Sequence, residues 1–373
     1  MSDYLNEEYC VFDNDASASS FGWNFQSNAG IFLFLKYIQQ AEDIKIESKL
    51  QDIEITLLDG NKVFAQAKSS QDFTVAKDTK EKFKDAIVSL ARNKQDGNKL
   101  VYISNVPDTF KSATGVFNNS VVPYTDCLSG IKDEIDKAIQ STIASIEKKL
   151  AAETKQEKRR RIQIAKEMVE NFDKSTLYIS TIHPYWGNEE NRYQSISDAV
   201  LSFLVDDIKL SRDDAISIKQ RLLEHWQLRF EHNSTIKDTE SQKKLKKSDF
   251  VWPVAAFLID NELSEIYDCL TFTPDKCITN EVKRILESSE CFYHERFEFS
   301  NSVLQEFNQF KKENRLDAVE KVFIKSHYNL FLNEFSNIED LEEREYITKA
   351  FMFRIICNYK NLQRIGKGAG MKI

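Results

Sequence analysis

Apolar and polar residues alternate between positions 44 and 70 in a pattern that predicts three short strands. The first predicted strand, 44–47, is brief and contains two isoleucines. Residues 52–58 alternate acidic or hydroxyl side chains with isoleucine and leucine, the period of two that is typical of a half-buried strand. The Asp59-Gly60 pair tolerates the positive φ angles of a tight hairpin turn, so 63–68 is the predicted return strand.

The return strand directs successive side chains to opposite faces of the sheet. Phe64, Gln66 and Lys68 therefore share one face, opposite the small apolar residues between them. A hairpin of this kind can set Asp52 and Glu54 on the same face as Gln66 and Lys68. The pattern thus predicts a cluster of carboxylate, amide and ammonium groups on one side of two strands.

The rest of the N-terminal half alternates predicted helices with predicted strands. The apolar run at 29–39 predicts a helix buried on most faces, and 78–93 carries apolar residues at helical spacing. Residues 100–103 and 177–180 have similar sequences and predict two buried strands. Between those strands, 128–172 predicts a long helical insertion. This alternation is typical of an α/β domain.

From residue 193 onward the spacing of apolar residues predicts only helices. Their expected bounds are 193–206, 211–231, 248–268, 278–290, 299–313, 315–336 and 338–361. Scarce glycine and proline, ten and five residues, also favour helices. We therefore expect two domains: an α/β domain at 1–205, interrupted by the insertion at 128–172, and an all-α domain at 206–373.

Composition and charge narrow the classes of protein. Charged residues make up 29% of the 373 positions and apolar residues 41%, which is ordinary for a soluble globular protein. No apolar run reaches the roughly 20 residues that span a bilayer, and the N-terminus lacks a secretory signal. Six scattered cysteines without CxxC pairing indicate reduced thiols, so we expect a cytoplasmic protein. The net charge of −8 argues against a protein that coats nucleic acid but permits a local basic surface.

The predicted cluster matches the needs of metal-dependent phosphodiester cleavage. Mg²⁺ prefers oxygen ligands, usually one or two carboxylates completed by water and substrate phosphate. A lysine beside such a metal can stabilise the negative charge that develops during the reaction. Asp52, Gln66 and Lys68 supply these groups as an acid followed by an amide-x-Lys pair on the next strand. The alternative, a surface hairpin with solvated charges, also fits so short a motif.

The order of these residues resembles a known nuclease family. Residues 21–30 begin an apolar helix that contains Gln26, and Glu47, Asp52 and the Gln66-Ala67-Lys68 triplet follow. Over roughly residues 15–205 the chain resembles the PD-(D/E)xK-type double-stranded DNA endonuclease domain of bacterial antiphage effectors. Those effectors include the nucleases associated with CD-NTase signalling, and the chain is similar to the nuclease subunit of Lamassu systems.

The resemblance implies a restriction-endonuclease-like fold, a mixed sheet flanked by helices, and a role for each matching residue. Asp52 and Gln66 would bind Mg²⁺ or Mn²⁺, and Lys68 would be the catalytic lysine. Gln26 would reach the site from the helix, Glu47 is a further acidic position, and Glu54 lies on the face shared with Asp52. The chain departs from the pattern at Gln66, where an amide replaces an acid and removes one charge from the metal site.

The resemblance also implies partners and regulation. Lamassu nucleases act with an SMC-like ATPase and a small accessory subunit, and they cut double-stranded DNA after release and oligomerisation. The region at 206–373 is too short and too helical to resemble the nucleotide-sensing domain of the CD-NTase-linked nucleases. We therefore expect a Lamassu-like effector whose helical domain binds partner proteins. A non-catalytic scaffold with a nuclease fold and an RNA-cleaving effector are the alternatives.

The basic clusters and the histidines indicate a function less specifically than the motif of Asp52, Gln66 and Lys68 does. The run of basic residues in the insertion could contact phosphates of DNA or could be a solvated helix face; it comprises Lys155, Lys158, Arg159, Arg160 and Arg161. The lysine-rich segment 243–247 is expected to be a loop between helices. His183 follows the last predicted strand and precedes a proline, which is more typical of a loop residue than of a catalytic base.

Overall fold

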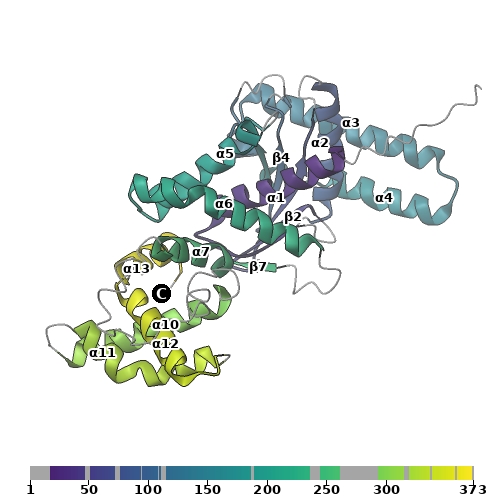
Figure 1. The fold of residues 1–373 in the computed structure, drawn as a ribbon. Coiled ribbons are helices and arrows are strands. Elements are labelled where there is room, and N and C mark those ends of the chain that lie inside the picture. The colour runs from purple at the N-terminus through teal and green to yellow at the C-terminus, as the bar shows by residue number, and fades with distance from the viewer. Residues whose placement is uncertain are drawn as a thin grey trace, which may run out of the picture. The chain divides into compact units, whose positions relative to one another are not determined.

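The chain divides into two compact units in the computed structural model, which Figure 1 shows as a ribbon. Unit 1 consists of Met1–Gly30, Ile46–Glu54 and Val63–Ser195, and unit 2 of Ile31–Lys45, Ile55–Lys62 and Ile196–Ile373. The residues that the structure describes are 17–46, 51–71, 76–93, 95–107, 109–110, 115–185, 189–235, 244–260, 293–314, 319–336, 338–357 and 359–371. The expected boundary at residue 205 lies ten residues beyond Ser195, where the last segment of unit 1 ends, but two earlier segments belong to unit 2.

Seven described strands form one mixed sheet with the order β5-β6-β4-β3-β2-β1-β7. Their bounds are Ala41–Ile46 (β1), Ile53–Leu57 (β2), Lys62–Lys68 (β3), Lys99–Ser104 (β4), Val121–Pro123 (β5), Leu177–Thr181 (β6) and Lys244–Lys246 (β7). The mixed sheet with flanking helices confirms the expected α/β class. The three strands of the predicted hairpin segment correspond to β1, β2 and β3.

The centre of the sheet is parallel, because β3 pairs with β4 and β4 pairs with β6 in that sense. Lys68 at the end of β3 lies opposite Ser104 at the end of β4, and Ser104 lies opposite Thr181 at the end of β6. The carboxyl ends of these strands therefore meet at one edge, the position where open α/β sheets commonly bind ligands. β5 pairs antiparallel with β6.

The prediction that β2 is half-buried is wrong. All of its residues except Thr56 are buried, including Glu54, and the five central residues of β3 are buried as well. Residues that point to either face of β2 are buried, so both faces of the mixed sheet are covered at this strand. The polar residues that alternate with apolar ones in β2 therefore do not mark a solvent-exposed face of the strand.

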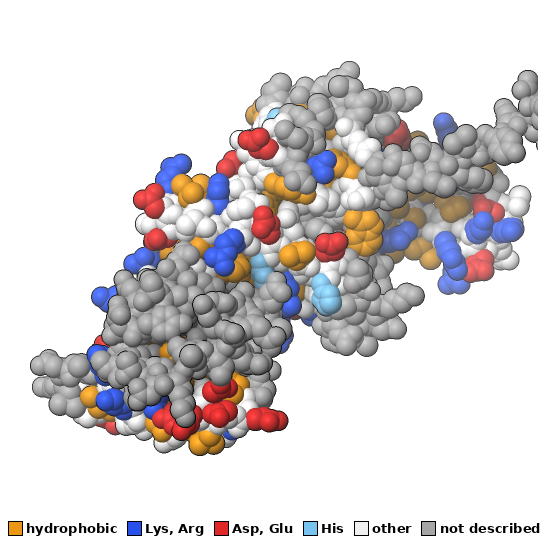
Figure 2. Space-filling model, in the orientation of Figure 1, with side chains coloured by type: hydrophobic (Ala, Val, Ile, Leu, Met, Phe, Trp, Pro, Cys, Tyr) orange, Lys and Arg blue, Asp and Glu red, His pale blue; other side chains and the backbone are white. Residues whose placement is uncertain are grey.

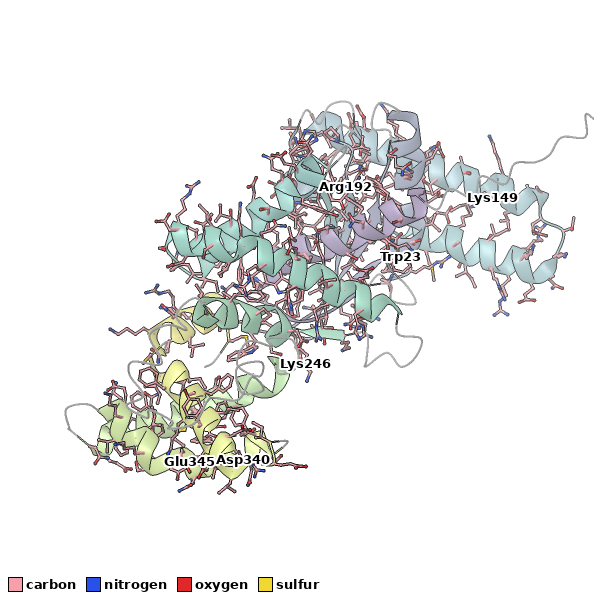
Figure 3. All side chains as sticks on the ribbon, viewed as in Figure 1. Trp23, Lys149, Arg192, Lys246, Asp340 and Glu345 are labelled. Carbon is pink, nitrogen blue, oxygen red and sulfur yellow. The ribbon has the colours of Figure 1, made fainter. Side chains whose placement is uncertain are left out.

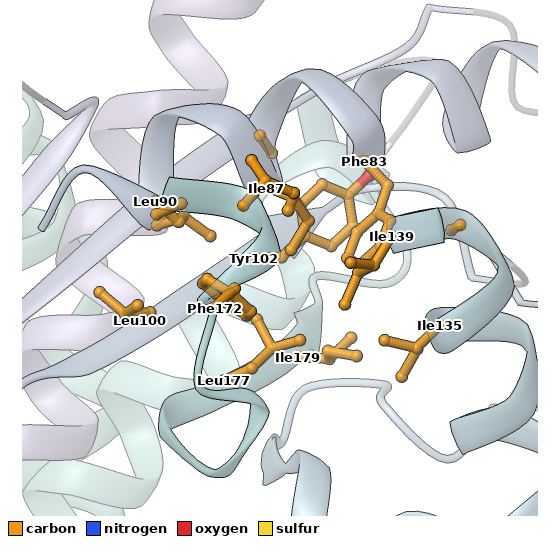
Figure 4. Packing of buried hydrophobic residues seen from close by; sticks show 14 of the residues in the cluster. Phe83, Ile87, Leu90, Leu100, Tyr102, Ile135, Ile139, Phe172, Leu177 and Ile179 are labelled. Atoms are coloured by element: carbon orange, nitrogen blue, oxygen red, sulfur yellow. The ribbon is translucent and has the colours of Figure 1, made fainter. Parts of the chain in front are cut away.

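Helices of unit 1 pack around the parallel strands. The described ones are α1 (Ser17–Tyr37, of which unit 1 holds the part up to Gly30), α2 (Ala76–Ala91), α3 (Ser129–Ala152), α4 (Gln156–Glu170) and α5 (Glu189–Ser202, of which unit 1 holds the part up to Ser195), with short 3-10 turns η1 (Tyr124–Asp126) and η2 (Lys174–Thr176). One core cluster joins Phe64 of β3 and Tyr102 of β4 to Phe83 of α2, Ile135 of α3 and Val169 of α4; Figure 4 shows its packing. The segment expected to be a helical insertion consists of α3 and α4, which run side by side (Figure 1).

Unit 2 contains the helical C-terminal region that the sequence predicts. Its described helical elements after residue 202 are η3 (Phe203–Asp207, a π-helix), α6 (Arg212–Thr235), α7 (Lys247–Asp260), α10 (Tyr293–Glu313), α11 (Val319–His327), η5 (Tyr328–Phe335), α12 (Leu341–Cys357) and α13 (Tyr359–Gly368). The single helix expected at 315–336 is a helix followed by a 3-10 segment, and the one expected at 338–361 is interrupted between α12 and α13. The helix expected at 278–290 lies outside the described residues.

The C-terminal region is not entirely helical, and the prediction of a loop at 243–247 is wrong in part. Lys244–Lys246 is strand β7, which pairs antiparallel with β1. Lys244 also forms an ion pair with Asp43 of β1 at 2.9 Å. The lysine-rich composition favours a loop, but backbone pairing with β1 makes this segment a strand. Local sequence does not reveal a partner so distant in the chain. Among the described helices none is long and apolar enough to cross a membrane.

Candidate functional site

Asp52 lies immediately before β2 and reaches across to the carboxyl end of β3. Its Oδ2 accepts a hydrogen bond from the backbone N–H of Ala67 at 2.9 Å and forms an ion pair with Lys68 Nζ at 3.0 Å. Gln66 Nε2 lies 3.3 Å from Asp52 Oδ1. Both charged side chains are partly covered, with 15% of Asp52 and 26% of Lys68 exposed. The structure thus brings together the three residues of the predicted motif.

Gln66 is buried and makes a second contact that sequence reasoning missed. Its Nε2 donates to Oε1 of Gln51 at 2.7 Å, and Gln51 Nε2 donates to the backbone carbonyl of Ser89 in α2 at 2.7 Å. Gln51 is itself almost fully buried. No periodicity singles out Gln51, because it precedes the strand and its partner lies 38 residues away in the sequence.

Loops beyond the parallel strands are tied together by the side chain of Asn105, which directly follows β4. Asn105 accepts from the backbone N–H of Ser70 at 2.8 Å and donates to the carbonyl of Ser70 at 2.7 Å. Its Nδ2 also lies 3.2 Å from the carbonyl of Tyr185, which follows β6. Lys82 of α2 donates to the carbonyl of Ser69 at 2.7 Å. These contacts fix the chain just after Lys68 and add a second ammonium group near the end of β3.

Helix α1 approaches the same end of β3. A methyl group on the Cα of Gly22 would lie 3.9 Å from Ser69 Oγ, so the helix backbone passes close to the residue after Lys68. Gln26 is one helical turn further on and shares the face of Gly22. Its Oε1 is buried and has no hydrogen-bond partner among the described residues. A buried acceptor without a donor is uncommon and is compatible with a ligand contact.

The N-terminal part of α1 is also held by a buried polar network. Asn28 Nδ2 donates to Tyr185 OH at 3.2 Å, Asn24 accepts from the same hydroxyl, and Asn24 Nδ2 donates to Tyr193 OH at 3.0 Å. Burial raises the pKa of Tyr185, with a further contribution from Tyr193, so the hydroxyl stays neutral. Phe25 packs edge-on against the ring of Tyr185. The network fixes the rotation of α1 and hence the direction of Gln26.

The remaining predicted site residues do not all join Asp52. Glu54 is buried on β2, and Glu47 lies outside the described residues. His183 is anchored through its backbone: its N–H donates to Asn119 Oδ1 at 3.0 Å, and its carbonyl accepts from Ser195 Oγ at 2.6 Å. Those contacts agree with the interpretation of His183 as a loop residue.

The predicted basic cluster lies at the end of the α3–α4 hairpin. All five of its residues are exposed; they are Lys155, Lys158, Arg159, Arg160 and Arg161. Arg161 pairs with Glu157 at 2.6 Å, and Arg159 donates to the backbone carbonyl of Glu153 at 3.3 Å. Figure 2 shows basic side chains gathered at this end of the hairpin with acidic ones between them, and Figure 3 labels Lys149 on the adjacent helix. The cluster belongs to unit 1, as Asp52 does.

The described residues of the site offer few oxygen donors to a hard cation. Within the described part of the chain, no group of three or more His, Cys, Asp or Glu side chains is placed to hold a metal ion. Asp52 contributes one carboxylate, and the amide oxygens of Gln66 and Gln26 are neutral. To bind here, Mg²⁺ or Mn²⁺ would have to take most of its ligands from water and substrate phosphate, and the Gln66 amide would have to turn, because its Nε2 faces Asp52 Oδ1. These donors do not fit zinc, which prefers histidine and cysteine.

Comparisons of this chain with protein-family models, with curated proteins and with solved structures find no match.

Proposed function

We propose that the chain is a metal-dependent endonuclease that cleaves double-stranded DNA. The observation that carries the proposal is the contact of one carboxylate, Asp52, with both Lys68 and Gln66 at the carboxyl edge of the parallel strands. A carboxylate with an ammonium group in hydrogen-bond contact, and a glutamine amide beside them, are groups that metal-dependent hydrolysis of a phosphodiester uses. The fold that the proposal implies is the restriction-endonuclease-like sheet.

Each side chain has a distinct role in this proposal. Asp52 would hold the cation together with Gln66, whose amide would turn its oxygen toward Asp52. A bound cation would lower the pKa of a coordinated water and neutralise charge on the phosphoryl group. Lys68 places a fixed positive charge beside the carboxylate, where it orients the attacking water or stabilises the developing charge. Gln26 supplies a further acceptor from α1. Asn105 and Lys82 hold the Ser69–Ser70 backbone and so limit the movement of Lys68.

The basic end of the α3–α4 hairpin is the proposed contact surface for DNA. Lysine and arginine contacts to phosphates make binding dependent on salt and independent of sequence. Between residues 147 and 161 there are seven Lys or Arg and three Glu, so this segment carries a charge of +4 in a chain of −8. That local reversal of sign favours an anionic polymer as the partner of the hairpin.

In the proposed biological setting the chain is the effector of a Lamassu-like antiphage complex in the cytoplasm. An SMC-like ATPase and a small accessory subunit would bind its helical C-terminal region and keep the nuclease inactive. Release followed by oligomerisation would bring together two sites, because one site cuts one strand. The rate of double-strand breaks per protomer should then rise with protein concentration; a constant rate over a hundredfold dilution of a monomer would contradict self-association.

A non-catalytic scaffold is the second candidate, and one observation favours it. Asp52 already has an ion pair with Lys68 and a backbone N–H as donors, so its charge is satisfied without a metal. RNA as the substrate in place of DNA is the third possibility, since the same groups hydrolyse either phosphodiester.

A cleavage assay with a chelator separates these candidates. The full chain is incubated with supercoiled plasmid and Mg²⁺ or Mn²⁺, with and without EDTA, beside Asp52→Asn and a matched Asp43→Asn variant. Asp43 also pairs with a lysine, Lys244, at 2.9 Å, but on β1. We expect cleavage by the wild type and by Asp43→Asn, and none with EDTA or in Asp52→Asn. Cleavage that survives EDTA and both substitutions would refute the proposal, and parallel reactions with RNA distinguish the substrates.

A further inference from the structure

The carboxylate of Asp52 is surrounded by hydrogen-bond donors. Its Oδ2 accepts from the backbone N–H of Ala67 at 2.9 Å and from Lys68 Nζ at 3.0 Å, and its Oδ1 faces Gln66 Nε2 at 3.3 Å. Donors of this kind stabilise a carboxylate as the anion, so its charge is satisfied without a cation. The Gln66 amide therefore presents its NH₂ group, and not its oxygen, to Asp52.

A chain of hydrogen bonds that begins in α2 fixes this orientation of the Gln66 amide. The backbone carbonyl of Ser89 only accepts, so Gln51 donates its Nε2 to it, at 2.7 Å. Gln51 therefore presents Oε1 to Gln66, whose Nε2 donates to it at 2.7 Å. A glutamine amide can in general adopt either orientation, but here a backbone group that cannot be reversed imposes one.

The same chain of bonds opposes rotation of the Gln66 amide. A half-turn would set Gln66 Oε1 against Gln51 Oε1, and two acceptors form no hydrogen bond. If Gln51 turned as well, its Oε1 would face the carbonyl of Ser89, which is again an acceptor. Gln51 is 3% and Gln66 4% exposed, so solvent does not compensate for a bond that is not made.

We propose that Gln51 and Gln66 form a latch that holds the Asp52 site closed to a divalent cation. The latch consists of the two bonds that run from Ser89 through Gln51 to Gln66. While both bonds are made, an NH₂ group, which cannot coordinate a cation, lies beside Asp52 Oδ1. The inference rests on the proposed function, because it assigns the regulation of the site where the cation would bind. The Gln66 oxygen can turn toward Asp52 only after the bond between the two glutamines breaks.

A latch predicts that removal of Gln51 increases metal affinity. Gln51→Met keeps the approximate length of the side chain and removes both bonds of the latch, so Mn²⁺ should bind more tightly. The expected gain is about fivefold, which corresponds to about 1 kcal/mol, the net contribution of one hydrogen bond. In a Gln66→Met background no amide remains to turn, so Gln51→Met should leave Mn²⁺ affinity unchanged. A gain that depends on Gln66 identifies coupling between the two residues.

Mn²⁺ titration of the full chain without nucleic acid, followed by electron paramagnetic resonance, measures this affinity apart from cleavage. The wild type, Gln51→Met, Gln66→Met and the double variant are compared, and Asp52→Asn defines binding outside the site. Thr142→Val is the matched control, because it removes another buried bond to a backbone carbonyl, that of Ala138, in unit 1. It should leave Mn²⁺ affinity unchanged. If Gln51→Met does not fold, Gln51→Asn serves, because its shorter amide cannot span both bonds.

Hydrogen exchange of the Gln66 side-chain amide tests the latch without any metal ion. In EDTA, nuclear magnetic resonance should show slow exchange of its NH₂ protons with solvent in the wild type, because both nitrogen-bound protons face acceptors. Exchange should be about fivefold faster in Gln51→Met, which lacks one of these acceptors. The Gln66 signal is assigned by its absence from the spectrum of Gln66→Met.

The outcomes separate failure of the latch from failure of the proposed function. Fast exchange of the Gln66 amide in the wild type overturns the latch alone. Mn²⁺ affinity of Gln51→Met within about twofold of the wild type, with Asp52-dependent binding present, does the same. Equal gains in the Gln66 and Gln66→Met backgrounds also overturn the latch, because they indicate a general loosening of the fold. Absence of Asp52-dependent Mn²⁺ binding in both the wild type and Gln51→Met overturns the proposed metal site and the latch with it. A gain confined to the Gln66 background supports the inference.

Discussion

Replacement of Lys68 by alanine tests the chemistry of the site most directly, because the fold offers a closely matched control. Lys68 and Asp52 form an ion pair at 3.0 Å with 26% and 15% of the side chains exposed. Lys244 and Asp43 form one at 2.9 Å with 38% and 10% exposed. Both lysines lie on strands, and both carboxylates also contact a neighbouring polar side chain. Lys68→Ala and Lys244→Ala therefore remove the same type of interaction at two places.

The expected effects on stability are similar and small. An exposed ion pair contributes about 0–1 kcal/mol, whereas loss of one partner of a fully buried pair costs roughly 3–5 kcal/mol. Asp52 keeps the backbone N–H of Ala67 as a donor after Lys68 is removed, and the site is partly open to water. We therefore expect about 1 kcal/mol of destabilisation for either variant, which lowers Tm by about 2–4 °C in a unit of this size.

The expected effects on cleavage differ by orders of magnitude. Loss of a fixed charge that stabilises the transition state costs about 3–4 kcal/mol, which corresponds to a rate lower by roughly 10²–10³. Lys68→Ala should show this loss in a plasmid-nicking assay, while Lys244→Ala should cleave within about twofold of the wild type. Circular dichroism melts of both proteins verify that they fold. Activity of Lys68→Ala within a few-fold of the wild type would refute the proposed role, and parallel loss in both variants would indicate a stability effect.

Two further predictions concern the DNA surface and pH. Lys158→Glu combined with Arg160→Glu should weaken DNA binding, lower the slope of log K against log salt and leave Mn²⁺ affinity unchanged, because neither residue lies at the metal site. His225 on α6 should make unfolding of unit 2 dependent on pH. Burial, with a smaller contribution from Arg229, lowers its pKa from 6.5 to about 4. Between pH 6.5 and 4 the unfolded chain therefore binds a proton that the folded chain does not, so stability should fall as pH falls. Urea titrations across this window should show the dependence, and His225→Phe should reduce it.

Controls for these two predictions come from the same elements. Lys219→Glu with Lys321→Glu changes the same net charge on α6 and α11 and should leave the salt slope as in the wild type. If the salt slope of the Lys158/Arg160 double variant equals that of the wild type, DNA binds at another surface of the protein. His232, an exposed histidine on α6, is the control for pH, and His232→Phe should retain the wild-type dependence. A pH profile equal in wild type and His225→Phe would assign the proton uptake to another group.

Local sequence determined the elements that carry the candidate site. The Asp59-Gly60 turn and the alternating residues on either side predict β2 and β3, because turn chemistry and side-chain period act over a few residues. The same local rules predict α3, α4 and most C-terminal helices, whose apolar residues recur at helical spacing. The proximity of Asp52 to Gln66 and Lys68 also follows from the hairpin, since adjacent strands place these residues opposite one another.

Tertiary structure decided everything that depends on contacts between distant segments. The alternation in β2 predicts an exposed face, but both faces of the folded sheet are covered at this strand, and Glu54 is a buried residue. Strand β7 exists because β1 offers an unpaired edge to lysine-rich residues 200 positions further along the chain. The orientation of Gln66 depends on a carbonyl in α2, which reaches it through Gln51. The periodicity of the sequence shows which positions are apolar, but it does not show which distant segment packs against them. These features are therefore determined only by the tertiary structure.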